Sequence, residues 1–275
     1  MTNEWRAGAE AQPGPEAQPG PEAQPGPEAA GGRQGGRPEV TRRSLAGLAA
    51  GAGIMASVAG GIAPDARAAA GEIGEPGHTP GPREALALLM AGNRRWARGR
   101  AMHPHQSVPW RLHVAAHQEP FATVVSCIDS RVPPEIIFDR GIGDMFVIRT
   151  GAQALDDLVV LGSIEFGPVN YRSARLMVVL GHQKCGAVIA AIESIQSGRP
   201  APGHIQAVVD ALRPAYRVAK PLPGDLTDNM IRAQIRLTVR RLRLDPLLRA
   251  RIADGRLAIV GGYYHLRSGI VDLIA

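Results

Sequence analysis

The sequence predicts an α/β fold in which helices flank a mostly parallel central sheet of four to five strands. Short apolar runs rich in β-branched residues recur from residue 121 onward, as strands in a buried sheet require. Segments of helical length and periodicity alternate with these runs. Such alternation is typical of a parallel sheet covered by helices. With 45% hydrophobic and 20% charged residues, the composition is that of an ordinary globular protein.

The N-terminal part of the chain is expected to lie outside this fold. Residues 1–40 are predicted to be a disordered lead, because AQPGPE occurs three times in tandem and this density of proline and glycine cannot build a packed core. Residues 41–70 resemble a twin-arginine signal segment. Arg42 and Arg43 precede an uncharged run rich in Gly and Ala, and small-residue cleavage candidates follow.

The alternative for residues 41–70 is a single membrane anchor. The run is interrupted by glycines and is poor in large apolar residues, so cleavage is favoured over stable spanning. Residues 71–275 would then form one α/β domain in the periplasm or outside the cell, with no stable membrane span after cleavage.

Two segments precede the first expected strand. Pro82–Arg100 is predicted to be an amphipathic helix, because proline suits a first turn and large apolar residues recur on one side. His103-Pro-His-Gln-Ser107 follows as a loop. Its two histidines are spaced for metal binding, but a solvated loop is the commoner explanation.

The remaining elements follow from hydrophobic periodicity. Strands are expected at Phe121–Ser126, Met145–Ile148, Leu176–Leu180 and Leu257–Val260, with Ile270–Ile274 as a closing edge strand. Helices are expected from Pro133 and over Asp156–Phe166, Ala187–Gln196 and Ile231–Arg251. The net charge is +6, and many arginines fall in the last of these helices. No aromatic residues are interleaved with them, so a solvated helix face is favoured and no nucleic-acid partner is expected.

Candidate metal ligands follow two of the expected strands. Cys127 ends the first strand, while His182 and Cys185 follow the third. Sites in parallel sheets form beyond the carboxyl ends of strands, so these side chains are expected to meet. Two thiolates and an imidazole suit zinc, whose catalytic sites keep a fourth position exchangeable. A Cys127–Cys185 disulfide is the rival interpretation for an exported protein.

A charged pair lies beside the first of these cysteines. In extended or turning backbone, residues at i, i+2 and i+4 tend to face the same way, which places Asp129 and Arg131 near Cys127. Asp129 can ligate zinc or accept a hydrogen bond from zinc-bound water, and Arg131 can hold it by a bidentate ion pair. A surface salt bridge is the plainer alternative.

Five segments together resemble the β-class carbonic anhydrases, over roughly Pro82 to the C-terminus. They are CIDSRVPPE at Cys127–Glu135, GDMFVIRTGA at Gly143–Ala152, GSIEF at Gly162–Phe166, GHQKCGAV at Gly181–Val188 and GGYYHLRSGIVDL at Gly261–Leu273. The combination of C-x-D-x-R with H-x-x-C is specific, whereas either motif alone is weak.

The resemblance implies reversible hydration of carbon dioxide to bicarbonate and a proton through zinc-bound hydroxide. The family's zinc ligands fall on Cys127, His182 and Cys185, and its Asp–Arg dyad on Asp129 and Arg131. The residues implied for the substrate pocket are Gln118, Phe146, Gly151, Phe166 and Gly186, with the two phenylalanines as its apolar wall. The family works as a dimer or multiples of it, with N-terminal helices such as Pro82–Arg100 wrapping the partner.

Two departures from the family pattern refine these expectations. Arg149-Thr-Gly-Ala-Gln153 stands where the family often has Arg-Asn-x-Ala-Asn, which affects fine tuning more than activity. Val124 stands where members with a closed, bicarbonate-regulated site tend to carry Trp. An open site is therefore predicted, with Asp129 paired to Arg131 and ligating the metal only in a closed form. Two alternatives stay open: a carbonyl sulfide or carbon disulfide hydrolase on the same fold, and a non-catalytic extracytoplasmic zinc-binding protein.

Overall fold

A computed structural model describes residues 78–275 of the chain. The tandem repeats and the twin-arginine segment, predicted within residues 1–70, lie outside the described residues. Over residues 78–275, no helix combines the length and apolar character needed to cross a bilayer.

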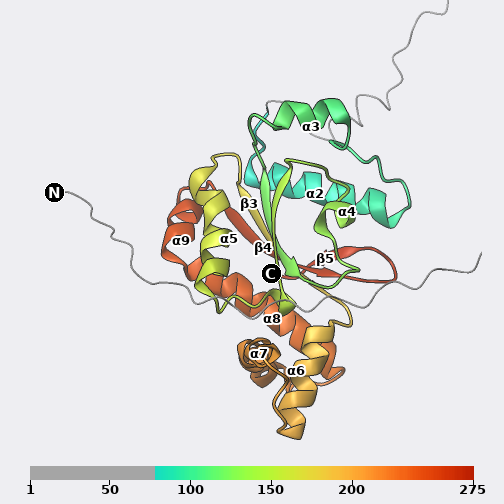
Figure 1. Cartoon of the computed structure of the whole chain (residues 1–275), viewed down its shortest axis with the longest axis vertical. Helices are drawn as coiled ribbons and strands as arrows, with labels where there is room; N and C mark the ends of the chain where they lie inside the picture. Colours follow the sequence, from blue (N-terminus) through green and yellow to red (C-terminus); the bar gives the residue numbers. More distant parts are fainter. Residues whose placement is uncertain (1–77) are drawn as a thin grey trace, which may run out of the picture. The chain divides into compact units, whose positions relative to one another are not determined.

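A five-stranded sheet in the order β2-β1-β3-β4-β5 forms the centre of the fold (Figure 1). Its strands are β1 Ala122–Cys127, β2 Met145–Thr150, β3 Leu176–His182, β4 Ala258–Tyr264 and β5 Val271–Leu273. The first four are parallel, and β5 pairs with β4 in the antiparallel sense at the edge. The predicted α/β class, strand number and closing edge strand are confirmed.

Strands β1 and β3 lie at the middle of the sheet, and every residue of both is buried. Their continuous apolar sequences, ATVVSC and LMVVLGH, suit strands that are covered on both faces. The two strands are parallel neighbours, with Ser126 opposite Leu180, so their carboxyl ends lie side by side. This register positions the candidate site.

One face of the sheet is covered by α2 (Pro82–Ala97) and the short α4 (Pro134–Ile137). Leu88 and Leu89 pack in one buried cluster with Phe121, Val124 and Leu180. Asn93 of α2 adds hydrogen bonds to three backbone groups, Ile137 O, Gly269 O and Val271 N. The apolar side of α2 is thus covered by its own chain, and its expected contact with a partner stays a prediction.

The other face carries α8 (Leu226–Leu244), which lies on the opposite side of the sheet from α2 in Figure 1. Glycines in β3 and β4 allow this close packing. A Cβ on Gly181 would meet Ile235 Cδ1 at 2.5 Å, and one on Gly261 would meet Ile235 Cγ2 at 2.7 Å. Around α8 lie α5 (Leu158–Asn170), α6 (Gly186–Ser197), α7 (Ile205–Ala219) and α9 (Pro246–Ala253).

Three helical features differ from the sequence prediction. The expected helix Ile231–Arg251 is split into α8 and α9, because Asp245 accepts hydrogen bonds from the amides of Leu247 and Leu248 and Pro246 occupies a first turn. Helix α7 was not predicted, although Val209, Leu212, Ala215 and Ala219 form its buried side. The short α3 (Val108–Val114) was also not predicted, and none of its residues is buried.

Candidate metal centre

Three metal-competent side chains meet at the carboxyl end of the sheet. Cys127 is the last residue of β1, His182 is the last residue of β3, and Cys185 is the N-cap of α6. One ligand atom from each lies within 4.8 Å of the others, and all three residues are buried. Cys127 and Cys185 are 58 positions apart in the sequence. The parallel pairing of β1 and β3 brings the three ligands together.

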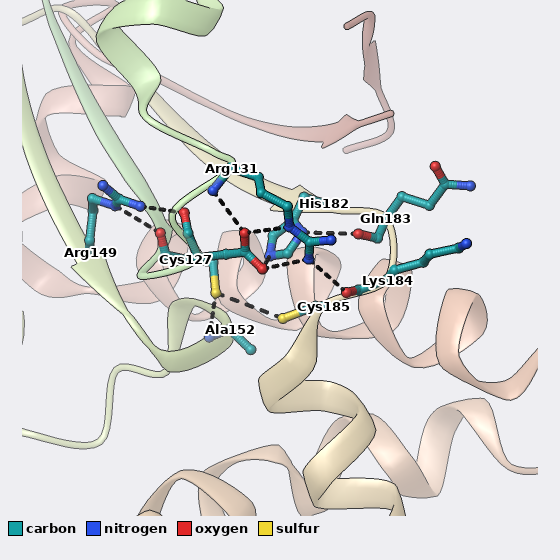
Figure 2. A network of polar contacts seen from close by, with 9 residues as sticks. Cys127, Arg131, Arg149, Ala152, His182, Gln183, Lys184 and Cys185 are labelled. Carbon is teal, nitrogen blue, oxygen red and sulfur yellow. Dashed lines mark hydrogen bonds and ion pairs between the residues drawn. The ribbon is translucent and has the colours of Figure 1, made fainter. Parts of the chain in front are cut away.

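The imidazole of His182 is oriented by its own loop. Its Nδ1 lies 3.0 Å from the backbone carbonyl of Gln183, as Figure 2 shows. Because a carbonyl only accepts hydrogen bonds, Nδ1 carries a proton, and in the neutral imidazole Nε2 then presents a lone pair. Nε2 is buried and has no hydrogen-bond partner among the residues that the structure describes. A buried, unpaired lone pair facing two thiols is the arrangement that a metal ion would satisfy.

The two thiols are free and lie 3.7 Å apart, Sγ to Sγ. The hydrogen bond from Cys185 lowers the pKa of Cys127 to about 4, and that thiolate together with burial raises the pKa of Cys185. The backbone amide of Ala152 also donates to Cys127 Sγ, at 3.4 Å. A pair of thiols that shares one proton without a metal would lose both protons on binding a soft divalent cation.

Asp129 and Arg131 form a bidentate pair beside the cluster. Arg131 Nε donates to Asp129 Oδ1 at 2.9 Å and Nη2 donates to Oδ2 at 2.7 Å, with the Arg131 amide also donating to Oδ1. These contacts lower the pKa of Asp129 to about 2, so it is a carboxylate at neutral pH. Its Oδ2 lies 3.9 Å from His182 Nε2, which places the carboxylate next to the ligand atoms.

Backbone contacts around the site involve residues to which the sequence analysis assigned no role. Arg149 of β2 donates to the carbonyls of Cys127 and Asp129, and Arg131 Nη2 reaches the carbonyl of Lys184 at 3.3 Å (Figure 2). Ala152 and Lys184 both have positive φ angles, 50° and 54°, which are uncommon for residues other than glycine. The RTGA segment was noted in the sequence, but its pattern did not indicate these hydrogen bonds.

Two of the predicted substrate residues lie close to this cluster. Gly151 immediately precedes Ala152, whose amide contacts Cys127. Gly186 is the first residue of α6, directly after Cys185.

Three other predicted substrate residues lie at the amino end of the sheet. Gln118 precedes β1 and donates through Nε2 to the hydroxyl of Tyr171 at 2.9 Å. Phe146 lies with its ring centroid 5.2 Å from Tyr171 and 6.5 Å from Phe166. The six residues of β1 separate the two ends by roughly 17 Å at 3.3 Å per residue. The fold of one chain thus does not bring this group to the metal ligands.

Both loop histidines make hydrogen bonds within the protein, His105 through its ring and His103 through its backbone amide. His105 Nδ1 lies 2.7 Å from Asp144 Oδ1, and its ring stacks on Trp110 at 3.9 Å. The His103 amide donates to Asp139. Within residues 78–275, the Cys127–His182–Cys185 group is the single cluster of three such ligands. The interpretation of this segment as a loop is confirmed: His103, Gln106 and Ser107 are exposed, His105 is half-buried and Pro104 is buried.

Comparison with known proteins identifies the family. A family profile described as carbonic anhydrase matches residues 122–271. The chain is 42% identical over 189 residues to carbonic anhydrase 2 of Mycobacterium tuberculosis, covering 68% of this chain and 90% of that protein. Among solved structures, it resembles the Coccomyxa β-carbonic anhydrase in complex with acetazolamide, with a TM-score of 0.55, 26% identity, and coverage of 69% of this chain and 86% of that one.

A further structural similarity supports the fold alone. One of two tetrameric β-carbonic anhydrases from Sordaria macrospora superposes with a TM-score of 0.56 at 21% identity, covering 69% of this chain and 96% of that one. Taken together, the profile match, the identity to a named relative and the shared fold show that this chain belongs to the β-class carbonic anhydrase family.

Proposed function

We propose that this chain catalyses the reversible hydration of carbon dioxide to bicarbonate and a proton, with zinc as its metal. The observation that carries the proposal is the convergence of Cys127, His182 and Cys185 beside a pre-formed Asp129–Arg131 pair. Thiolate and imidazole ligands in this ratio suit zinc better than magnesium or calcium, which prefer oxygen. Family membership supports the same chemistry.

Among the residues of the chain, Asp129 is the one that would orient the nucleophile through its carboxylate. Zinc, when bound, is a Lewis acid that lowers the pKa of water to about 7 and so supplies a hydroxide nucleophile near neutral pH. With the metal held by Cys127, His182 and Cys185, the Asp129 carboxylate would accept a hydrogen bond from the nucleophile and orient it toward carbon dioxide, while Arg131 keeps the carboxylate ionised. Because Arg131 already holds both Asp129 oxygens, we do not count Asp129 among the residues that would hold the metal, which corresponds to the open form predicted from the sequence.

We further propose that a second copy of the chain completes the substrate pocket. Gln118, Phe146 and Phe166 lie too far from the ligands of their own chain to contact the same carbon dioxide molecule. Helix α5 nearby exposes large apolar side chains: Leu158 is 85% exposed, Val159 is 76% and Phe166 is 53%. Apolar exposure of this extent marks an association surface. A homo-oligomer would cover it and bring the aromatic group of one chain to the metal ligands of another.

Carbon dioxide hydration, measured by stopped flow with and without a chelator on protein beginning near Gly71, tests the enzymatic proposal. We expect activity that is lost with the metal and regained when zinc is restored. Sulfide release from carbonyl sulfide or carbon disulfide, without carbon dioxide hydration, would instead favour the hydrolase. Zinc-replete protein without activity across a wide pH range would favour a non-catalytic zinc-binding role.

We also propose export by a twin-arginine-type route, on the basis of Arg42, Arg43 and the uncharged run that follows them. This route carries folded proteins, so zinc could be bound before export. Mass spectrometry of the mature N-terminus tests the proposal. A start near residue 70 is expected, whereas an intact chain held in the membrane would contradict it.

A further inference from the structure

Arg149 is a cation that interacts with the backbone of the candidate catalytic turn. Its Nε donates to the carbonyl of Cys127 at 2.9 Å, and its Nη2 donates to the carbonyl of Asp129 at 2.6 Å (Figure 2). The side chain comes from β2, where Arg149 is the partner of Ser126 in the parallel ladder. It is partly buried, and no carboxylate pairs with it among residues 78–275. Its hydrogen-bonding capacity is therefore directed to two backbone carbonyls.

These carbonyls bracket the point at which the chain leaves the sheet. The β1–β2 ladder ends at Cys127 and Thr150, and one further hydrogen bond runs from the Ile128 amide to the Thr150 carbonyl. Beyond it, further hydrogen bonds hold the turn. The Val132 amide donates to the Asp129 carbonyl, the Arg131 amide donates to the Asp129 carboxylate, and Arg131 Nη2 donates to the Lys184 carbonyl. The hydrogen bond from Arg149 to the Asp129 carbonyl thus holds the chain to β2 two residues beyond Cys127, where the ladder ends.

We infer that Arg149 is a positioning residue, which fixes the Cys127–Arg131 turn so that the Asp129 carboxylate stays paired with Arg131 beside the metal ligands. The inference rests on the proposed carbon dioxide hydration. A guanidinium suits this role because its rigid fork presents two donors at once, and a charged donor strengthens both hydrogen bonds. An ammonium is a single point charge and cannot hold both carbonyls in the same way. Arg149 acts through Asp129 and touches no reacting atom.

Substitution of Arg149 by Met and by Lys tests the inference. We expect kcat to fall by about 10- to 100-fold in both variants, as is usual when a residue supporting a metal site is lost. Met keeps the length of the side chain, and Lys keeps the charge, so a fully active Arg149→Lys would show that charge alone suffices and would overturn the inference.

A matched control is available at the other end of the sheet. Arg243 donates through the same two atoms, Nε and Nη2, to the carbonyl of Ile259 near the start of β4. Arg243→Met removes an equivalent contact to strand backbone, and we expect kcat to stay within twofold of wild type, as for a site away from the chemistry. An equal fall in Arg149→Met and Arg243→Met would indicate a general loss of structure and would refute the specific role.

Coupling to Asp129 is the decisive measurement. If Arg149 acts through Asp129, the double variant Arg149→Met/Asp129→Asn should be no slower than Asp129→Asn alone. Hydrogen exchange gives a readout independent of activity: the amides of residues 128–132 should exchange faster in Arg149→Met and at the wild-type rate in Arg243→Met. Multiplicative losses in the double variant, or unchanged exchange, would refute the inference. A wild-type protein without hydration activity would instead refute the proposed function.

Discussion

At the carboxyl end of the sheet, the candidate metal ligands are buried and already converge. At the amino end, Gln118 and Phe166 are exposed, and both contact Tyr171. The ligand end is built from two adjacent strands and their following turns, so one chain suffices to assemble it. At the amino end, Gln118, Phe146 and Phe166 instead gather around the side chain of Tyr171. The metal ligands therefore come from a single chain, and this contrast is the basis of our proposal that a second chain completes the substrate pocket.

Removal of a ligand should have the largest effect. Cys127→Ala is expected to lose bound metal and to reduce hydration to the uncatalysed background, because two remaining ligands cannot hold zinc in a tetrahedral site. Metal analysis and stopped-flow hydration check this, with circular dichroism to confirm that the fold is retained. A variant that keeps one equivalent of zinc and normal turnover would mean that the metal lies elsewhere.

Loss of the carboxylate should leave the metal in place. Asp129→Asn is expected to retain zinc and to lose about 10²- to 10⁴-fold in kcat, the usual range for an acid–base group. Asp210→Asn is a matched control, because Asp210 also pairs with an arginine, Arg213 Nε at 2.8 Å, on the surface of α7. Equal activity in the two variants would exclude the assigned role of Asp129.

Mixed oligomers can test whether the two ends act in trans. Gln118→Ala and Asp129→Asn proteins, each weakly active, should regain activity when unfolded and refolded together. If Gln118 serves the partner's metal site, half of the dimers carry one intact site, so about a quarter of wild-type activity is expected for a symmetric interface. Activity that stays at the level of the separate variants would place Gln118 in its own chain's site or outside the reaction.

The smallest effect concerns the ionisation of Asp129. In the folded state its pKa is lowered to about 2 by the hydrogen bonds from Arg131. Because the folded pKa lies below the unfolded value, the pair stabilises the protein above the usual carboxyl pKa, and this contribution is lost as the pH falls toward 2. Arg131→Met should return the pKa of Asp129 toward its usual value and lower kcat by about tenfold. A ¹³C NMR titration of the side-chain carboxyl checks the shift, and an unchanged pKa would show that Arg131 is not its cause.

The central strands were predictable because their sequences are continuously apolar where burial is complete. The runs FATVVS and LMVVL read as strands since both faces of the sheet are covered, and the structure confirms both. Helix α7 was missed although its buried side follows helical spacing, because Pro214 inside it suggests an interruption. The break between α8 and α9 depends on one Asp–Pro step, whose capping role becomes clear only with the helix geometry.

The sequence by itself determined the family, the α/β class and the residues with metal-binding chemistry, because these depend on residue types at short spacing and on strand periodicity. The sequence also predicted that the three metal ligands meet, but only the tertiary structure showed which other site residues lie with them. Parallel pairing of β1 with β3 brings Cys127 to His182 and Cys185, while the length of β1 holds Gln118 at the opposite end. The hydrogen bonds from Arg149 to the carbonyls of Cys127 and Asp129 also became visible only in the tertiary structure, because contacts with backbone carbonyls leave no pattern in residue types.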